Sequence, residues 1–453
     1  MRAWKKAARL ALVGALTFAS PVMGETLSDS LATAYRTSGL IDQNRAVLRA
    51  ADEDVALALS ALRPVISYAL GADYTTPSIS DEFSLTASVT GSLLLYDFGR
   101  SDLGVDVAKE SVLATRAALV DIENTILLNT ATAYFDVRRA EAFVGLRENN
   151  VRLLVEQLRA ARDRFEVGEV TRTDVSQAEA RVAAARSALA ADQGGLAQSR
   201  ELFKSIVGRF PGQLQAPPRA PSIPDTIGGA RGQAQRNNPQ LLQVQHQVKA
   251  AELAVEQARR EIYPSLNATG SFAIDDDAED RTSLGLTLSG PIYQGGAIAS
   301  GQRRAQALRD QARAQLYTTG LLVDQQVGNA YANLGVAIAS IDASNRQVAA
   351  AQLALEGIQE ELQLGARTTL DVLDQEQELL DAQTALVSAQ ADRQIAIYQV
   401  LDSIGLLTAE NLGLNVPIYD PATYYNAVKD GPTYNVSPEG KRLDRVLKAI
   451  GRQ

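Results

Sequence analysis

Four short stretches of the chain alternate apolar and polar residues with a period of two, which is typical of β-strands whose faces meet different surroundings. In the clearest, FSLTASVTGSL from Phe83 to Leu93, every second residue is Ser or Thr. Each stretch has about 9–11 residues, the length that crosses a bilayer when a strand is tilted. The pattern predicts two β-hairpins with strands at about 65–76, 82–95, 265–275 and 281–293.

Long helices with coiled-coil spacing follow each predicted hairpin. Apolar residues step by three and four on both sides of Gly168, and the same steps recur on both sides of Gly365. Each set predicts an antiparallel helical hairpin with its tip at the glycine. The leading helix of the first set, from about Arg100 to Phe165, would be roughly 100 Å long at 1.5 Å per residue.

The two halves of the chain repeat one another at an offset of 197 residues. Tyr96 aligns with Tyr293, and the tip sequence VGEVTRTDV, residues 167–175, aligns with LGARTTLDV, residues 364–372. A Pro-rich segment, RFPGQLQAPPRAPSIPD, lies between the copies. The duplication predicts two structural repeats with the same order of elements. The predicted boundaries are a first repeat at 25–208, a linker at 209–225, a second repeat at 226–412 and a polar tail at 413–453.

The junctions between strands and helices carry proline or glycine. Pro64 and Pro264 precede the first strand of each hairpin, where proline ends a helix and fixes φ for the change of direction. The sequences YDFG and YQGG follow the second strands. Gly99, Gly295 and Gly296 in these sequences give the backbone the freedom to enter the long helix.

The first 24 residues predict a cleaved secretory signal. Four basic residues precede a short apolar core, and small residues follow it. Removing this segment changes the formal net charge from −9 to −13. Such an acidic chain is a poor candidate for binding nucleic acid. The sequence has no cysteine, which excludes disulfides and a lipidated N-terminal cysteine, and no later run of 18 apolar residues predicts a membrane helix.

Four strands are too few to close a membrane barrel, and open sheet edges are not tolerated in hydrocarbon. The strands of several chains must therefore combine, giving eight in a dimer or twelve in a trimer. An eight-stranded barrel is filled by side chains, whereas a larger one leaves an aqueous lumen suited to the Ser- and Thr-rich faces. The sequence predicts a homo-oligomeric outer-membrane pore continued by a helical tube.

Over residues 25–429 the chain resembles the TolC family of outer-membrane efflux and type I secretion factors. The resemblance rests on the duplicated order of elements, on LRPVIS and IYPSLN before the hairpins, on YDFGR and YQGG, and on the two tips. It implies a mainly α fold with β. In this fold a homotrimer shares a twelve-stranded β-barrel in the outer-membrane lipid, and coiled-coil helices form a periplasmic α-barrel.

The resemblance also implies a function and partners. Such a channel exports proteins or small toxic molecules in a tripartite system. A periplasmic adaptor and an inner-membrane transporter of the ABC or RND type complete that system. The resemblance implies no cofactor.

The second tip carries an acidic stripe that the first tip lacks. Asp371, Asp374, Glu378 and Asp381 step by three, four and three, which places them on one helical face. By resemblance, Asp371 and Asp374 form the narrow periplasmic constriction, where about six carboxylates of a trimer would attract cations. The alternative is an ordinary solvated face, which the sequence favours for Glu378 and Asp381.

The two tips also carry a candidate latch. By resemblance, Arg367 links to Asp174 and Thr173 of the other hairpin and holds the entrance closed. The family's companion contact uses tyrosine and glutamine, but this chain has Leu362 and Asp163 there. The closed state is therefore expected to depend more on the charged pair, unless that pair is only a surface contact.

Other chemistry is weakly represented in the sequence. No Ser-His-Asp set, phosphate-binding loop or metal cluster is present, and the single histidine, His246, predicts no ligand, so an enzyme is not expected. The acidic segment 273–281 lacks calcium-loop spacing and predicts a solvated loop.

Two alternative functions remain from the sequence. One is a periplasmic coiled-coil adaptor or structural protein without a pore, and the other is a surface adhesin with a coiled-coil stalk.

Overall fold

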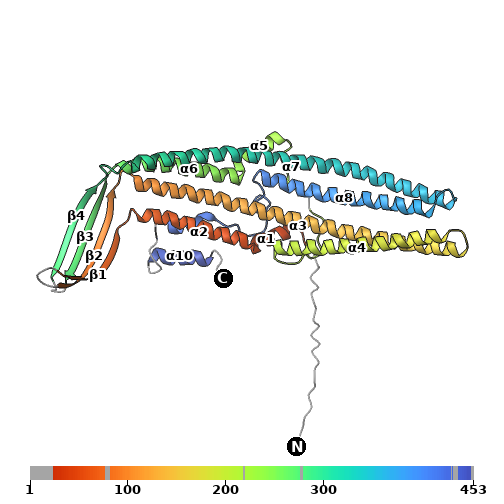
Figure 1. Ribbon diagram of the computed structural model, residues 1–453, viewed down its shortest axis with the longest axis horizontal. Helices are drawn as coiled ribbons and strands as arrows, with labels where there is room; N and C mark the ends of the chain where they lie inside the picture. Colours follow the sequence, from red (N-terminus) through yellow and green to blue (C-terminus); the bar gives the residue numbers. More distant parts are fainter. Residues whose placement is uncertain are drawn as a thin grey trace, which may run out of the picture.

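The protein is long and narrow, with a small β-sheet at one end and helical hairpins reaching to the other (Figure 1). The computed structural model describes residues 24–76, 82–217, 220–275, 279–429, 431 and 437–449. The predicted signal, apart from Gly24, lies outside the described residues. Three residues of the acidic segment 273–281 and parts of the tail also lie outside them.

Both halves have the predicted order of elements, and the two long helices have the same length of 67 residues. Among the helices of the described residues, none is long and apolar enough to cross a membrane. The first repeat contains α1 (Leu27–Thr37), α2 (Gly39–Ser60), β1 (Val65–Thr75), β2 (Glu82–Tyr96), α3 (Arg100–Glu166) and α4 (Arg172–Val207). The second contains α5 (Ile227–Asn237), α6 (Pro239–Arg259), the 3-10 turn η1 (Arg260–Ile262), β3 (Ser265–Asp275), β4 (Asp280–Ser289), α7 (Ala297–Gln363) and α8 (Thr369–Ser403).

The four strands form one antiparallel sheet in the order β1-β2-β3-β4. Their register places most of the large apolar residues on one face, because Tyr68 is opposite Val89 and Val89 is opposite Phe272. The other face is polar, and the hydroxyl oxygens of Ser271 and Ser283 on it are 2.8 Å apart. The alternation predicted from sequence therefore produces a sheet with one apolar and one polar face.

The junctions adopt the predicted turns, with two differences. Gly99, Gly295 and Gly296 all have positive φ, between 59° and 85°. Phe98 also has a φ of 60°, where the second repeat has glycine, and its ring stacks on Tyr263 at 4.8 Å between ring centroids. β4 ends at Ser289 rather than near 293, since the following segment contains Pro291, which has no N–H for the sheet.

The main hydrophobic core lies midway along the molecule, where helices α1 to α5, α7 and α8 meet. The Pro-rich linker crosses this region and is held by equivalent tyrosines of the two repeats. Tyr134 donates to the Gln215 carbonyl at 2.7 Å, and Tyr331 donates to the Pro224 carbonyl at 2.6 Å. The tail, expected only to be polar, also forms helices α9 (Pro421–Val428) and α10 (Pro438–Ala449).

Candidate functional site

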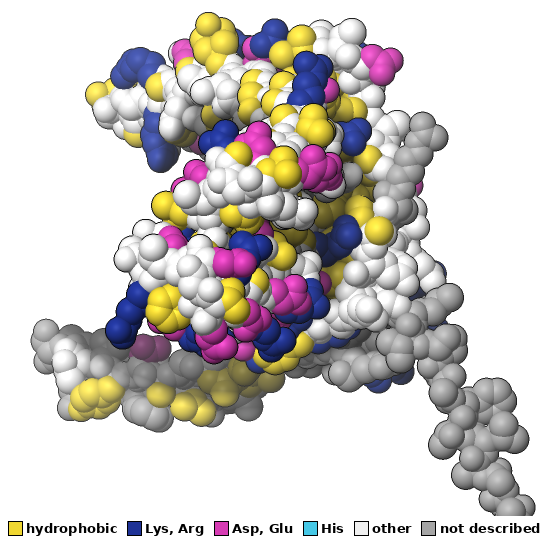
Figure 2. Space-filling model, turned by 90° about the vertical axis from the view of Figure 1, so that its right-hand side faces the viewer, with side chains coloured by type: hydrophobic (Ala, Val, Ile, Leu, Met, Phe, Trp, Pro, Cys, Tyr) yellow, Lys and Arg dark blue, Asp and Glu magenta, His cyan; other side chains and the backbone are white. Residues whose placement is uncertain are grey.

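The tips of the two helical hairpins form the end of the molecule farthest from the sheet (Figure 1). Seen from this end, acidic and basic side chains lie close together over the tips (Figure 2). The second helix of each hairpin begins with a capping box, made by Thr171 with Asp174 and by Thr368 with Asp371. The duplicated T-x-x-D sequence thus builds the same local structure twice.

Asp371, one of the two predicted constriction residues, is fixed by the start of α8. Its Oδ2 accepts hydrogen bonds from the backbone N–H and the hydroxyl of Thr368, both at 2.8 Å. These hydrogen bonds lower the pKa of Asp371 below its ordinary value. The carboxylate is therefore charged and points in a defined direction at neutral pH.

Asp374, the other predicted constriction residue, links the two hairpins of one protomer. It is one turn farther along α8 and forms an ion pair with Arg181 of α4. Both side chains are about half exposed. An ion pair between α4 and α8 resists separation of the two hairpins near their tips.

The predicted latch is not formed within the protomer. Arg367 forms its ion pair with Glu361 of its own hairpin, at 2.7 Å. Asp174 accepts the capping hydrogen bonds of Thr171 instead, and Thr173 is exposed. The charged contact between the hairpins is made instead by Arg181 and Asp374, which lie seven residues, or about two helical turns, beyond Asp174 and Arg367 in the sequence, while Asp174 serves as a cap.

Two residues of this region were missed by the sequence analysis. Arg181 aligns with Glu378 of the second repeat, so a reversal of charge between the copies was a signal that it had a distinct role. Glu376 is buried between two exposed acidic neighbours, Asp374 and Glu378, and the stripe pattern gave no sign of this. The remaining stripe residue, Asp381, accepts a hydrogen bond from Gln377 and is exposed, as expected for a solvated face.

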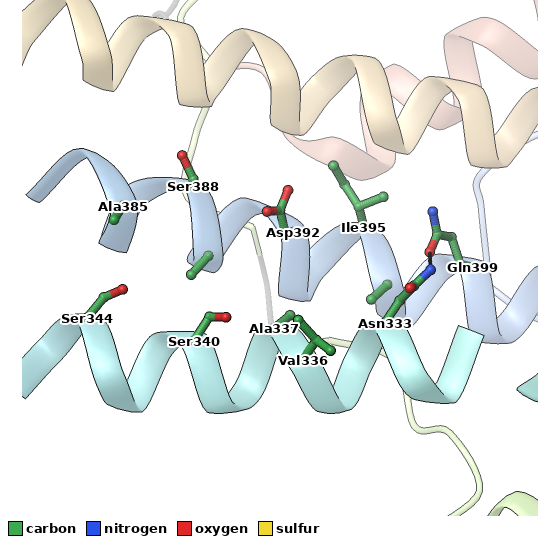
Figure 3. Close-up of a pocket in the computed structure, with 12 residues that line it drawn as sticks. Asn333, Val336, Ala337, Ser340, Ser344, Ala385, Ser388, Asp392, Ile395 and Gln399 are labelled. Carbon is green, nitrogen blue, oxygen red and sulfur yellow. Dashed lines mark hydrogen bonds between the residues drawn. The ribbon is translucent and has the colours of Figure 1, made fainter. Parts of the chain in front are cut away.

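A groove of about 530 Å³ runs between α7 and α8, away from the tips (Figure 3). Small side chains line most of it, with the Asn333–Gln399 hydrogen bond near one end. Among the described residues that line it, Asp392 alone is charged, and it is paired with Arg139 of α3. The groove therefore brings together no set of groups suited to acid–base or nucleophilic catalysis.

The family model for outer membrane efflux proteins matches residues 34–209 and 230–406, once in each structural repeat. The chain belongs to this family. It is 34% identical to the outer membrane efflux protein BepC of Brucella suis, over 96% of this chain and 97% of BepC. It is 27% identical to the outer membrane protein TolC of Escherichia coli, over 87% of each chain.

Solved channel structures share the fold. The CmeC outer membrane channel of Campylobacter jejuni matches with a TM-score of 0.76 at 15% identity, over 93% of this chain and 91% of CmeC. The open state of the MtrE channel of Neisseria gonorrhoeae matches with a TM-score of 0.75 at 19% identity, over 85% and 90%. The family membership confirms an outer-membrane export channel that extends into the periplasm, and it disfavours the adaptor and the adhesin.

Proposed function

We propose that three copies of the chain assemble into one channel, with a twelve-stranded barrel in the outer membrane and the hairpin tips at its periplasmic entrance. The single sheet carries this proposal. Its edge strands β1 and β4 are paired on one side only in the described residues, and their apolar side chains are exposed, with Tyr68 at 81% and Leu284 at 86%. Pairing β4 of one copy with β1 of the next would satisfy both edges.

The hairpin tips are proposed to narrow the channel at its periplasmic end. Asp371 and Asp374 lie within one helical turn of each other near the start of α8, so three copies would bring six carboxylates to one level. Asp371 is directed by its cap and Asp374 by Arg181. Arg181 offsets the charge of Asp374, so Asp371 supplies most of the net negative charge that would make such a constriction favour cations.

The proposed channel works with a periplasmic adaptor and an inner-membrane transporter of the ABC or RND type. It passes proteins or small toxic molecules outward, without a cofactor and without enzymatic activity. One relative for each substrate class supports this part of the proposal. PrtF of Dickeya chrysanthemi is a proteases secretion protein, and CusC of Escherichia coli belongs to a cation efflux system. Export of proteins and of small toxic molecules would be measured with this chain combined first with an ABC transporter and then with an RND transporter.

Assembly is the first prediction. The protein extracted from outer membranes in mild detergent should have the mass of a trimer, because one sheet exposes two unsatisfied edges and an apolar face. Native mass measurement checks this. A stable monomer, or a dimer without detergent, would exclude the shared barrel.

The constriction gives the second prediction. Replacing Asp371 and Asp374 together by Asn should lower cation-over-anion selectivity several-fold in planar bilayers, because charge at the narrowest level is lost while side-chain size is kept. Asp371 is the third residue of α8, where an amide oxygen can still accept from the Thr368 N–H, so α8 should still begin at the same place. The matched control is Asp381→Asn, farther along the same stripe. Equal selectivity in the double variant and the wild type would place the two acids outside the narrowest level.

A further inference from the structure

An acidic side chain is buried in the apolar seam between the two hairpins. Glu376 of α8 is only 3% exposed, and both carboxyl oxygens are buried without a hydrogen-bond partner among the described residues. Leu373 and Leu380, three residues before and four after it, are buried on the same helical face. Leu373 packs against Leu154 of α3 and Val182 of α4. The carboxyl group thus lies where α8 joins the first hairpin.

Burial raises the pKa of this carboxyl group, and no charged neighbour among the described residues offsets that effect. Its neighbours on α8 are committed elsewhere, since Asp374 is paired with Arg181 and Glu378 accepts from Gln347. The charged groups of the neighbouring helices point to solvent or are paired: Glu148 and Arg152 of α3 are exposed, Arg181 of α4 is held by Asp374, and Arg346 of α7 is held by Asp342.

We propose that Glu376 is a gating residue, which is protonated while the two hairpins are packed together and ionises when they separate, so that proton release accompanies opening. An uncompensated carboxylate cannot stay in an apolar seam without a large cost, whereas a solvated one has none. The proposal rests on the proposed function only in taking separation of the hairpins as opening of the entrance.

The direction of the pH effect follows from burial. Burial raises the pKa of Glu376 from 4.5 to about 7 in the packed arrangement, and separation into water would return it toward 4.5. Between these values the packed form binds more protons, so rising pH favours separation, and the effect levels off above about 7. The shift corresponds to about a three-hundredfold change in the packed-to-separated ratio for each protomer.

Hairpin separation can be measured without any transport assay, because the chain has no cysteine. Val182→Cys places a thiol in the seam, where Val182 is 5% exposed. In the purified full-length protein, its maleimide labelling rate is compared with the rate in a Val182→Cys/Glu376→Leu double variant at the same pH, which cancels thiol ionisation. We expect labelling about tenfold or more faster with Glu376 than with Leu at pH 8, and equal rates at pH 5.

The equivalent position in the first repeat provides a matched control. Glu179 lies 197 residues before Glu376 but is half exposed and paired with Arg162. Glu179→Leu should therefore leave the labelling ratio unchanged between pH 5 and pH 8. Glu376→Gln, which keeps the size and removes the charge, should behave like Glu376→Leu. Equal labelling of all backgrounds at pH 8 would overturn the role of Glu376.

Conductance measurements test, separately from hairpin separation, whether the tips form the channel entrance. In planar bilayers the wild-type open probability should rise between pH 5 and pH 7.5, and in Glu376→Leu that rise should be lost. If labelling of Val182→Cys depends on Glu376 and pH while conductance does not, Glu376 still controls hairpin separation. The tips would then not be the entrance, which overturns the proposed function instead.

Discussion

Gly405→Ala should prevent accumulation of the folded channel in the outer membrane. Gly405 follows α8 with a φ of +75°, and a Cβ added there would lie 2.4 Å from the Asn237 carbonyl oxygen and 2.8 Å from the Asn238 Cα. Both contacts are with backbone, so no side chain can rotate away. The end of α8 is also fixed to the start of α6, because Asn238 Nδ2 donates to the Ser403 carbonyl at 3.0 Å.

The expected loss exceeds the strain of a positive φ alone. That strain costs about 1–2 kcal/mol for a residue with a Cβ. Pushing α6 away from α8 beside the main core should bring the total to about 4 kcal/mol or more, the range that is exceptional for single substitutions. The yield of heat-stable oligomer in outer-membrane extracts, followed by thermal unfolding of what is recovered, measures the effect.

The first repeat provides the control at the equivalent position. Gly208 has a φ of +89°, and the first atom that an added Cβ would meet is the Thr37 hydroxyl at 3.3 Å. Since that contact is a side-chain atom and is looser, Gly208→Ala should cost about 1–2 kcal/mol and leave an assembled channel. Equal losses from the two substitutions would show that the backbone conformation, and not the contact with α6, limits folding.

Most of the fold could be predicted because its signals are local and repeated. The period-two strands, the coiled-coil steps and the prolines and glycines at the junctions each constrain the backbone within a few residues, and the duplication tests each signal twice. The end of β4 was missed because the aromatic Tyr293 suggested a longer strand, whereas Pro291 interrupts its hydrogen bonding. The tail helices α9 and α10 were missed because each is short, with 8 and 12 residues, and the segment after Leu412 was taken only as a polar tail.

The role of the candidate site stays a prediction, and its pairings were not predictable. Spacing placed four acids on one helical face, and the resemblance to the TolC family singled out Asp371 and Asp374 among them. Which basic residue each acid meets depends on how α4 and α8 are placed side by side, and that register is set by packing of Leu373 against the first hairpin. A single sequence does not show this register between α4 and α8. The burial of Glu376 could not be predicted for the same reason, because it also depends on how α8 packs against the first hairpin.

Reversing the charge of Arg181 should open the periplasmic entrance. In Arg181→Asp, an acid would face Asp374 across the seam and repulsion would replace attraction. One half-exposed pair contributes only about 0–1 kcal/mol. Three copies acting on one cooperative entrance, each changed from attraction to repulsion, would shift closure by a few kcal/mol, enough to change the populations strongly. Single-channel recordings at low salt, where screening is weakest, should show a higher open probability than in the wild type.

Two further variants decide which charged contact holds the hairpins together. The charge swap Arg181→Asp with Asp374→Arg should restore much of the closure, because it rebuilds the pair in reverse. Arg367→Ser should change the open probability much less than Arg181→Asp, because Arg367 is paired with Glu361 inside its own hairpin and does not join α8 to the first hairpin. If Arg367→Ser opens the channel and the Arg181 variants do not, closure depends on contacts between protomers at the tips, and the ion pair between α4 and α8 only positions Asp374.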